Sequence, residues 1–136
     1  MNETETKPRW PTKWSSHDNS GVTTVEAHPI AGQEVSITHQ SSRGVWCGRD
    51  LWSRDEAEFL AWAVRRASLH SGRTYTYDAD RRIEIAGRAI AGHEVTVRLY
   101  RRTGEHLNSR SYSQYRALFL ADAVAQALKV RIGRGW

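Results

Sequence analysis

The chain has 136 residues, of which 39% are hydrophobic and 26% are charged. This length excludes a large multidomain enzyme, and this composition supports a hydrophobic core rather than a wholly disordered chain. The single cysteine, Cys47, excludes an internal disulfide framework and a cysteine-cluster zinc site. No apolar stretch approaches the roughly 20 residues that span a bilayer, and the N-terminus has no apolar signal-peptide core. We therefore expect a cytoplasmic protein without a membrane partner.

The formal net charge of +5 is unevenly distributed along the chain. Residues 1–70 contain eight basic and nine acidic residues, whereas residues 71–136 contain twelve basic and six acidic ones. A basic half suits a polyanionic partner such as nucleic acid. Alternatively, the charge serves solubility alone and reflects a GC-rich bacterial or phage genome, because seventeen of the twenty basic residues are arginine.

An internal duplication organises the chain. At a constant offset of 60, fourteen positions within 23–69 are identical to their counterparts in the second half, without a gap. The expected organisation is a disordered N-terminus over 1–9, a first repeat over 10–70, a second repeat over 71–129 and a basic tail over 130–136. The two repeats are expected to form one compact domain, because one unit alone is too small to bury a sufficient core.

Each repeat begins with several short strands. Alternation of apolar and polar residues predicts strands at 34–40 and 94–100, with Val95, Val97 and Leu99 on one face. Turns that end in glycine follow, and 45–52 and 105–112 return as partner strands. Residues 22–29 and 82–89 supply another strand in each copy. A short leading hairpin arm is expected, with turns at 18–21 and 78–81.

A helix ends each repeat. Ser53 is a favoured N-cap residue, and Glu56 completes a capping box; Ser113 caps the second helix without such a glutamate. Apolar residues recur at helical spacing, and the many alanines allow each helix to sit close against its sheet. The predicted fold class is α+β: a tandem duplication of a β-β-β(-β)-α unit, with antiparallel sheets, one helix per repeat on one face and pseudo-twofold symmetry.

Motifs for catalysis, cofactors and metals are absent. There is no phosphate-binding loop, nucleophile elbow or zinc-protease motif, and no two of the six histidines are four residues apart on a helix. A metal site between His93 and His106 is conceivable, but exposed strand histidines are favoured. Glu34 and Glu94 could form a symmetric pair of catalytic carboxylates, but their place beside glycines favours binding to turn amides. We expect no enzyme, and Cys47 is interpreted as a small core residue.

A basic sheet face in the second repeat is the candidate binding site. If Val95, Val97 and Leu99 face the helix, the alternate residues of that strand face away from it. The same reasoning from an inward Leu107 places His106, Asn108 and two further residues on this outer face. The predicted nucleic-acid-binding residues are Arg88, Arg98, Tyr100, Arg102, Arg110 and Tyr112. Arginines would hold phosphates, and tyrosines would stack or wedge between bases.

Three tryptophans are candidate protein-interface residues: Trp46, Trp52 and Trp62. Trp46 and Trp52 are expected on the outer face of the first sheet, where the alternative is that they pack against the N-terminal segment. Trp62 is expected on the exposed side of the first helix, where it would contact a partner or pack onto the other half of the chain.

The leading hypothesis is a small non-enzymatic accessory protein, monomeric or weakly dimeric, that binds nucleic acid, with DNA favoured over RNA. The alternative is a protein-interaction module, such as an adaptor, an inhibitor or a phage-encoded modulator of a host complex.

Overall fold

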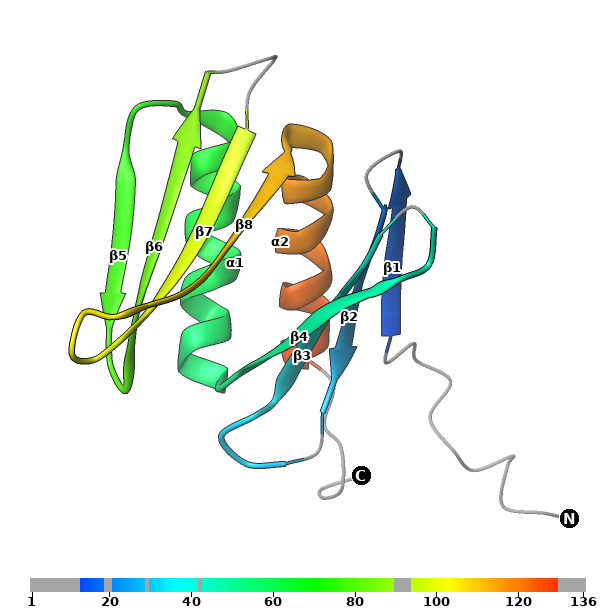
Figure 1. Ribbon diagram of the computed structural model, residues 1–136, viewed down its shortest axis with the longest axis horizontal. Helices are drawn as coiled ribbons and strands as arrows, with labels where there is room; N and C mark the ends of the chain where they lie inside the picture. The colour runs from blue at the N-terminus through cyan, green and yellow to red at the C-terminus, as the bar shows by residue number, and fades with distance from the viewer. Residues whose placement is uncertain (1–12, 19–20, 29, 42, 90–93, 130–136) are drawn as a thin grey trace, which may run out of the picture.

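The computed structural model describes residues 13–18, 21–28, 30–41, 43–89 and 94–129, without the side chains of residues 17, 18, 46 and 47. The expected disordered segment at 1–9 and basic tail at 130–136 lie outside these residues. Eight strands form two antiparallel four-stranded sheets, and each sheet is followed by one helix (Figure 1). The predicted α+β duplication is therefore confirmed.

The strands of each sheet follow one another in chain order. The first sheet contains β1 (Lys13–Asp18), β2 (Gly21–Ala27), β3 (Val35–Gln40) and β4 (Trp46–Trp52). The second sheet contains β5 (Thr74–Asp78), β6 (Arg81–Arg88), β7 (Glu94–Arg101) and β8 (His106–Ser113). The predicted leading hairpin arms are β1–β2 and β5–β6, in which Asp18 pairs with Gly21 and Asp78 with Arg82.

The two repeats match in detail. Helix α1 (Arg54–Leu69) and helix α2 (Gln114–Lys129) begin and end 60 residues apart. Each sheet also has an irregularity in the register of its last strand pair, after His39 in the first repeat and after Leu99 in the second. Both helix caps are as predicted: Ser53 and Glu56 form a capping box, and the Arg116 N–H donates to the Ser113 hydroxyl.

The helices are exchanged between the repeats. Helix α1 follows the first sheet but packs mainly against β6 of the second, and α2 packs mainly against β2 of the first. The expectation that each helix lies on the sheet of its own repeat is therefore wrong. The connections explain this: Ser53 alone separates β4 from α1, and no residue separates β8 from α2. So little chain cannot fold a helix back over the strands that precede it.

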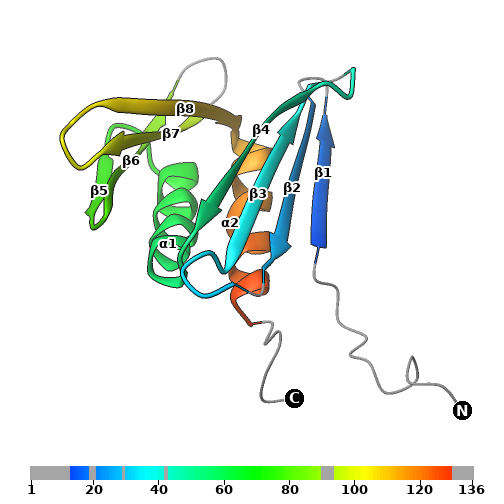
Figure 2. The ribbon, with the colours of Figure 1, turned by 60° about the horizontal axis from the view of Figure 1, so that its bottom comes forward.

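The core lies between the sheets and the two helices. Both helices lie on the same side of the sheets, and the sheets approach each other along β4 and β8 (Figure 2). Alanines on both helices are almost completely buried, which lets α1 and α2 pack directly against each other. Arg65 of α1 forms an ion pair with Asp122 of α2. Among the described residues, no helix is long and apolar enough to cross a membrane.

Candidate nucleic-acid interface

The candidate interface is the outer face of the second sheet, which is the face turned away from the helices (Figure 2). Its position follows from the strand pattern, because Val95, Val97 and Leu99 are buried as predicted and alternate residues must point the other way. We call this side of the sheet the outer face, and Thr96 is its one buried member among these strands at 5% exposure. The outer face consists of Arg82, Glu84, Ala86 and Arg88 on β6, Glu94, Thr96, Arg98 and Tyr100 on β7, and His106, Leu107, Ser109 and Ser111 on β8.

Arginines of the outer face differ in their ionic partners. Arg82 forms ion pairs with Glu84 at 3.1 Å and with Asp78 at 3.9 Å. Within the described part of the chain, Arg88, Arg98 and the neighbouring turn residue Arg102 form no ion pair. An arginine without a carboxylate partner keeps its full set of N–H donors for phosphate oxygens. Phosphate binding by these three residues stays a prediction.

Tyr100 and His106 form an aromatic pair on the outer face. Their ring centroids are 5.5 Å apart with an interplanar angle of 67°, and His106 Nε2 shares a hydrogen bond of 2.7 Å with the Ser109 hydroxyl. The register irregularity after Leu99 brings the two rings opposite each other. Their position agrees with the predicted sheet face. Tyr100 is half-buried and His106 is exposed, and aromatic rings at a surface can stack with a base.

A shallow groove of about 500 Å³ adjoins this face, between the β5–β6 turn and the β7–β8 turn. Its lining contains four arginines and two aspartates: Arg81, Arg82, Arg101, Arg102, Asp78 and Asp80, together with Ala79 and Gly104. Arg101 is paired with Glu105 at 3.1 Å. Arg81 and Arg82 are also paired, with Glu56 and Glu84, so Arg102 is the one arginine of this lining without an ion pair among the described residues.

Arg110 and Tyr112 do not lie on the outer face, and their prediction is wrong. Tyr112 pairs with Val95 and Arg110 pairs with Val97, so both side chains point to the helix side. Asn108 does the same. The prediction assumed an inward Leu107, but Leu107 is 41% exposed. The irregularity between Leu99 and Tyr100 changes the alternation along β8, and an uninterrupted pattern cannot reveal it.

The inward residues of β8 meet residues of the first repeat in a contact that we call the polar seam. The polar seam consists of His39, Gly48 and Asp50 from the first repeat and Asn108, Arg110 and Tyr112 from the second. Asn108 Nδ2 donates to Asp50 Oδ1 at 3.1 Å, and Arg110 Nε lies 3.6 Å from Asp50 Oδ2. A Cβ atom on Gly48 would lie 2.8 Å from the Arg110 guanidinium, so glycine leaves the space that this side chain occupies. Asp50 and Arg110 hold equivalent repeat positions and therefore join across the pseudo-twofold axis.

His39 and Tyr112 make the most buried contact of the polar seam. His39 Nε2 and the Tyr112 hydroxyl lie 2.7 Å apart and share a hydrogen bond. Burial, assisted by the positive charge of Arg110, lowers the pKa of His39 to about 4. Burial also raises the pKa of Tyr112 well above its ordinary value. Both groups are therefore neutral at pH 7, and the role of Tyr112 is to connect the repeats.

The three candidate tryptophans have different environments. Trp52 is 2% exposed because it pairs with the inward Val35, and the Arg81 guanidinium lies 4.8 Å from its ring centroid. Its predicted place on an outer face is therefore wrong. The side chain of Trp46 lies outside the described residues. Trp62 is 50% exposed, as expected for a residue that contacts a partner. It also packs edge-on against Tyr75 of β5, as expected for a residue that packs onto the other half of the chain.

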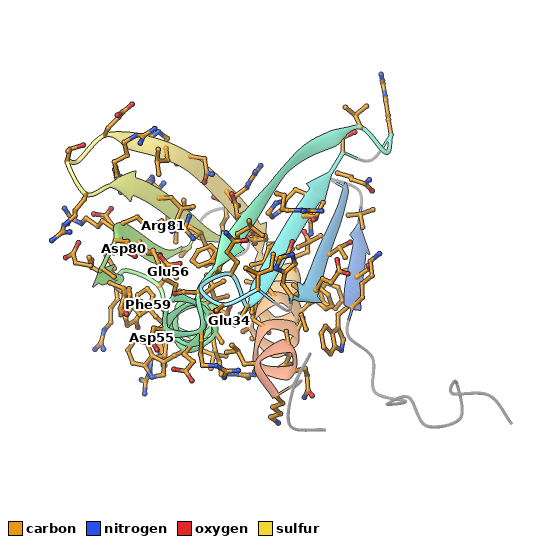
Figure 3. All side chains as sticks on the ribbon, turned by 90° about the horizontal axis from the view of Figure 1, so that it is seen from below. Glu34, Asp55, Glu56, Phe59, Asp80 and Arg81 are labelled. Carbon is orange, nitrogen blue, oxygen red and sulfur yellow. The ribbon has the colours of Figure 1, made fainter. Side chains whose placement is uncertain are left out.

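Carboxylates near the N-terminus of α1 have structural partners (Figure 3). Glu34 accepts hydrogen bonds from the backbone N–H groups of Gly32 at 3.1 Å and Arg54 at 2.9 Å, as predicted for the structural alternative. Burial alone would raise the pKa of Glu34, but these hydrogen bonds lower it overall. Glu56 forms an ion pair of 2.9 Å with Arg81. Within the described ranges, no three metal-binding side chains gather into a cluster.

Sequence reasoning missed two parts of this arrangement. Arg82 belongs to the outer face. It lies two residues before Glu84 and six before Arg88, and residues an even number apart on a strand share a face, so its position could have been predicted. The seam residues His39, Gly48 and Asp50 were also missed. Comparison with known proteins adds no assignment: neither a protein-family model nor a curated protein sequence matches the chain.

Proposed function

We propose that this protein binds nucleic acid through the outer face of the second sheet. The observation that carries the proposal is the combination of Arg88, Arg98 and Arg102, which have no carboxylate partner among the described residues, with the aromatic pair of Tyr100 and His106. The arginines would hold phosphates, and Tyr100 would stack with a base or wedge between two bases. Arg110 and Tyr112 are not part of this binding surface.

The first sheet supports the proposal by contrast. Its positions equivalent to Arg88, Arg98 and Tyr100 are His28, Thr38 and Gln40. Because the backbones of the two sheets correspond and these side chains do not, the positive charge belongs to the second copy alone at these positions. Glu84 and Glu94 lie opposite Arg98 and Arg88 on the same face, so the proposal rests on these arginines, which form no ion pair among the described residues, and not on a wholly basic surface.

Fluorescence anisotropy with labelled duplex DNA, single-stranded DNA and RNA at two salt concentrations tests the proposal. We expect DNA to bind more tightly than RNA. A plot of log affinity against log salt concentration should be linear, with a negative slope of about 0.7 to 0.9 for each phosphate that the protein neutralises. No binding to any of the three polymers at low salt would contradict the proposal.

Charge reversal locates the binding surface. We expect Arg98→Glu and Arg102→Glu each to weaken binding at least tenfold, because each removes a phosphate contact and adds a repulsive charge. Arg43→Glu is the matched control, since Arg43 is an exposed residue in the corresponding turn of the first repeat and the change in net charge is the same. Equal losses in all three variants would show that net charge, rather than the outer face, causes binding.

Protein binding through Trp62 is the second candidate function. Trp62 and Leu69 are 50% and 59% exposed, and they lie seven residues apart on one side of α1. Recovery of a protein partner from lysate after nuclease treatment, and its loss in Trp62→Ala, would support this candidate over the first.

A further inference from the structure

The open edge of the second sheet is formed by β5, the sequence Thr-Tyr-Thr-Tyr-Asp over Thr74–Asp78. β5 pairs with β6 on one side, and its other side has no neighbouring strand among the described residues. Edge strands are usually protected from pairing by proline, lysine or a bulge. β5 has none of these, and its threonines and tyrosines favour strand pairing.

An aromatic layer reaches this edge on the helix side of the sheet. Phe59 and Trp62 of α1 contact Tyr77 and Tyr75 of β5, with ring centroids 5.3 Å and 5.4 Å apart. The end of this aromatic layer is open to solvent, because half of Trp62 and more than half of Leu69 are exposed. The corresponding edge of the first repeat lacks this layer, since the equivalents of Trp62 and Tyr75 are Asp122 and Ser15.

We propose that β5 is the interface of a weak homodimer, in which it pairs antiparallel with β5 of a second copy about a twofold axis at Thr76. A twofold axis perpendicular to the sheet places the helices of both copies on the same side of the joined sheet. A residue on the helix side of one β5 is therefore paired with a residue on the helix side of the other, and likewise on the outer side. In this register Tyr75 lies opposite Tyr77 of the second copy, Thr74 lies opposite Asp78, and Thr76 lies opposite itself.

Charge complementarity selects a second copy as the occupant of this edge. Arg73 precedes β5, and Asp78 and Asp80 lie at its other end; all three are exposed. Antiparallel pairing places the Arg73 end of each strand beside the Asp78 and Asp80 end of the other. Alternation puts Arg73 on the helix side and Asp78, which lies 3.9 Å from Arg82, on the outer side, so the attraction acts between the strand ends and not between directly opposed side chains. The same charges would repel in a parallel arrangement, and an unrelated peptide has no reason to match both ends.

The spacing of the elements fits this dimer. Neighbouring strands lie about 4.8 Å apart, so the two β6 strands would lie three spacings, or about 14 Å, apart. Helix α1 packs mainly over β6, so the two copies of α1 would be separated by the same distance. This exceeds the usual 8–10 Å between packed helices. The exposed Trp62 of each copy is large enough to fill the difference.

The dimer is expected to be weak and to form independently of nucleic acid. One five-residue strand pair with Trp62 and Leu69 covers less than the roughly 800 Å² per partner that is typical of a stable complex. The two outer faces would lie side by side on one continuous sheet. That consequence for binding rests on the proposed function, whereas the dimer itself does not.

Sedimentation of the full chain without nucleic acid, from about 5 μM to about 500 μM, measures this self-association. We expect the average mass to rise from 15.5 kDa towards twice that value. Thr76→Lys and Thr76→Glu should each weaken association at least tenfold, because residue 76 faces its own copy and both changes oppose like charges. Circular dichroism checks that these exposed substitutions leave the fold intact.

Position 74 supplies a matched control on the same strand and face. Thr74→Lys faces Asp78 of the second copy and should keep or strengthen the dimer, whereas Thr74→Glu should weaken it. A monomer at all concentrations, a dimer that tolerates both changes at position 76, or equal loss from Thr76→Lys and Thr74→Lys would overturn the proposal. None of these outcomes bears on nucleic-acid binding, which is measured separately.

Discussion

Two neighbouring strands of the second sheet contain the same residue types at the same spacing but use them on opposite faces. β7 contains Arg98 and Tyr100, and β8 contains Arg110 and Tyr112. Arg98 and Tyr100 lie on the outer face, whereas Tyr112 is 4% exposed and Arg110 is held by Asp50 in the polar seam. An arginine followed two residues later by a tyrosine can thus lie on either face of the sheet, and the register of the strand decides which face it is.

The strongest test of this difference removes the tyrosine rings. Tyr112→Ala should lower the free energy of unfolding by about 3–5 kcal/mol, because it leaves a cavity in a buried site and removes the hydrogen-bond partner of His39. Tyr100→Ala should lower it by less than about 1 kcal/mol, since that ring is partly exposed. Urea denaturation of both variants measures the difference. Equal losses would mean that the two tyrosines are not on opposite faces.

The second test uses pH. The pKa of His39 is lowered to about 4 in the fold, below its ordinary value of 6.5, so between these values the unfolded chain binds more protons. The contribution of neutral His39 to stability is therefore complete above pH 6.5 and is lost as the pH falls towards 4. The expected loss is about 3 kcal/mol, because each pKa unit corresponds to about 1.4 kcal/mol.

Matched variants assign this pH dependence to the polar seam. His39→Gln should remove most of the fall in stability between pH 4 and pH 6.5, and Glu34, whose pKa is lowered in the fold, should contribute the remainder near the acid end. His106→Gln, which changes an exposed histidine of the outer face and leaves the polar seam intact, should keep the fall in stability that His39 causes. A wild-type profile that is already flat in this range would show that His39 is not held neutral by its surroundings.

The fold could largely be predicted from the sequence, because its signals are local and repeated. Alternation identified Val95, Val97 and Leu99 as a buried row, and Ser53 with Glu56 identified the start of α1. The exchange of helices could not be predicted in this way. An apolar stripe shows that a helix face is buried but does not show which sheet covers it.

The candidate site could be predicted only in part. The outer position of Arg98 and Tyr100 follows from the buried residues that alternate with them on their own strand. The inward position of Arg110 and Tyr112 depends on the irregularity after Leu99, which no residue type in the sequence indicates. One signal remained unused. Asp50 and Arg110 hold equivalent positions with opposite charges, and such a pair can meet across the twofold axis of a duplicated fold.

The third test compares the two arginines. Arg110→Ala should lower the free energy of unfolding by about 1–2 kcal/mol, because it leaves the Asp50 carboxylate, whose side chain is 10% exposed, with one partner fewer. Arg98→Ala should change it by less than about 0.5 kcal/mol, since no carboxylate among the described residues depends on Arg98. Thermal or urea denaturation distinguishes the two. A larger loss from Arg98→Ala would reverse the assignment of the two faces.

The smallest expected effects concern binding and separate the two residues of the outer face from each other. Arg98→Ala should lower affinity about fivefold at low salt and reduce the salt dependence by about one phosphate contact. Tyr100→Leu should lower affinity by a similar factor, because it removes a stacking ring, but should leave the salt dependence unchanged. Anisotropy titrations at several salt concentrations measure both quantities. If Tyr100→Leu changed the salt dependence as much as Arg98→Ala, the tyrosine would act by positioning phosphate contacts rather than by stacking on bases.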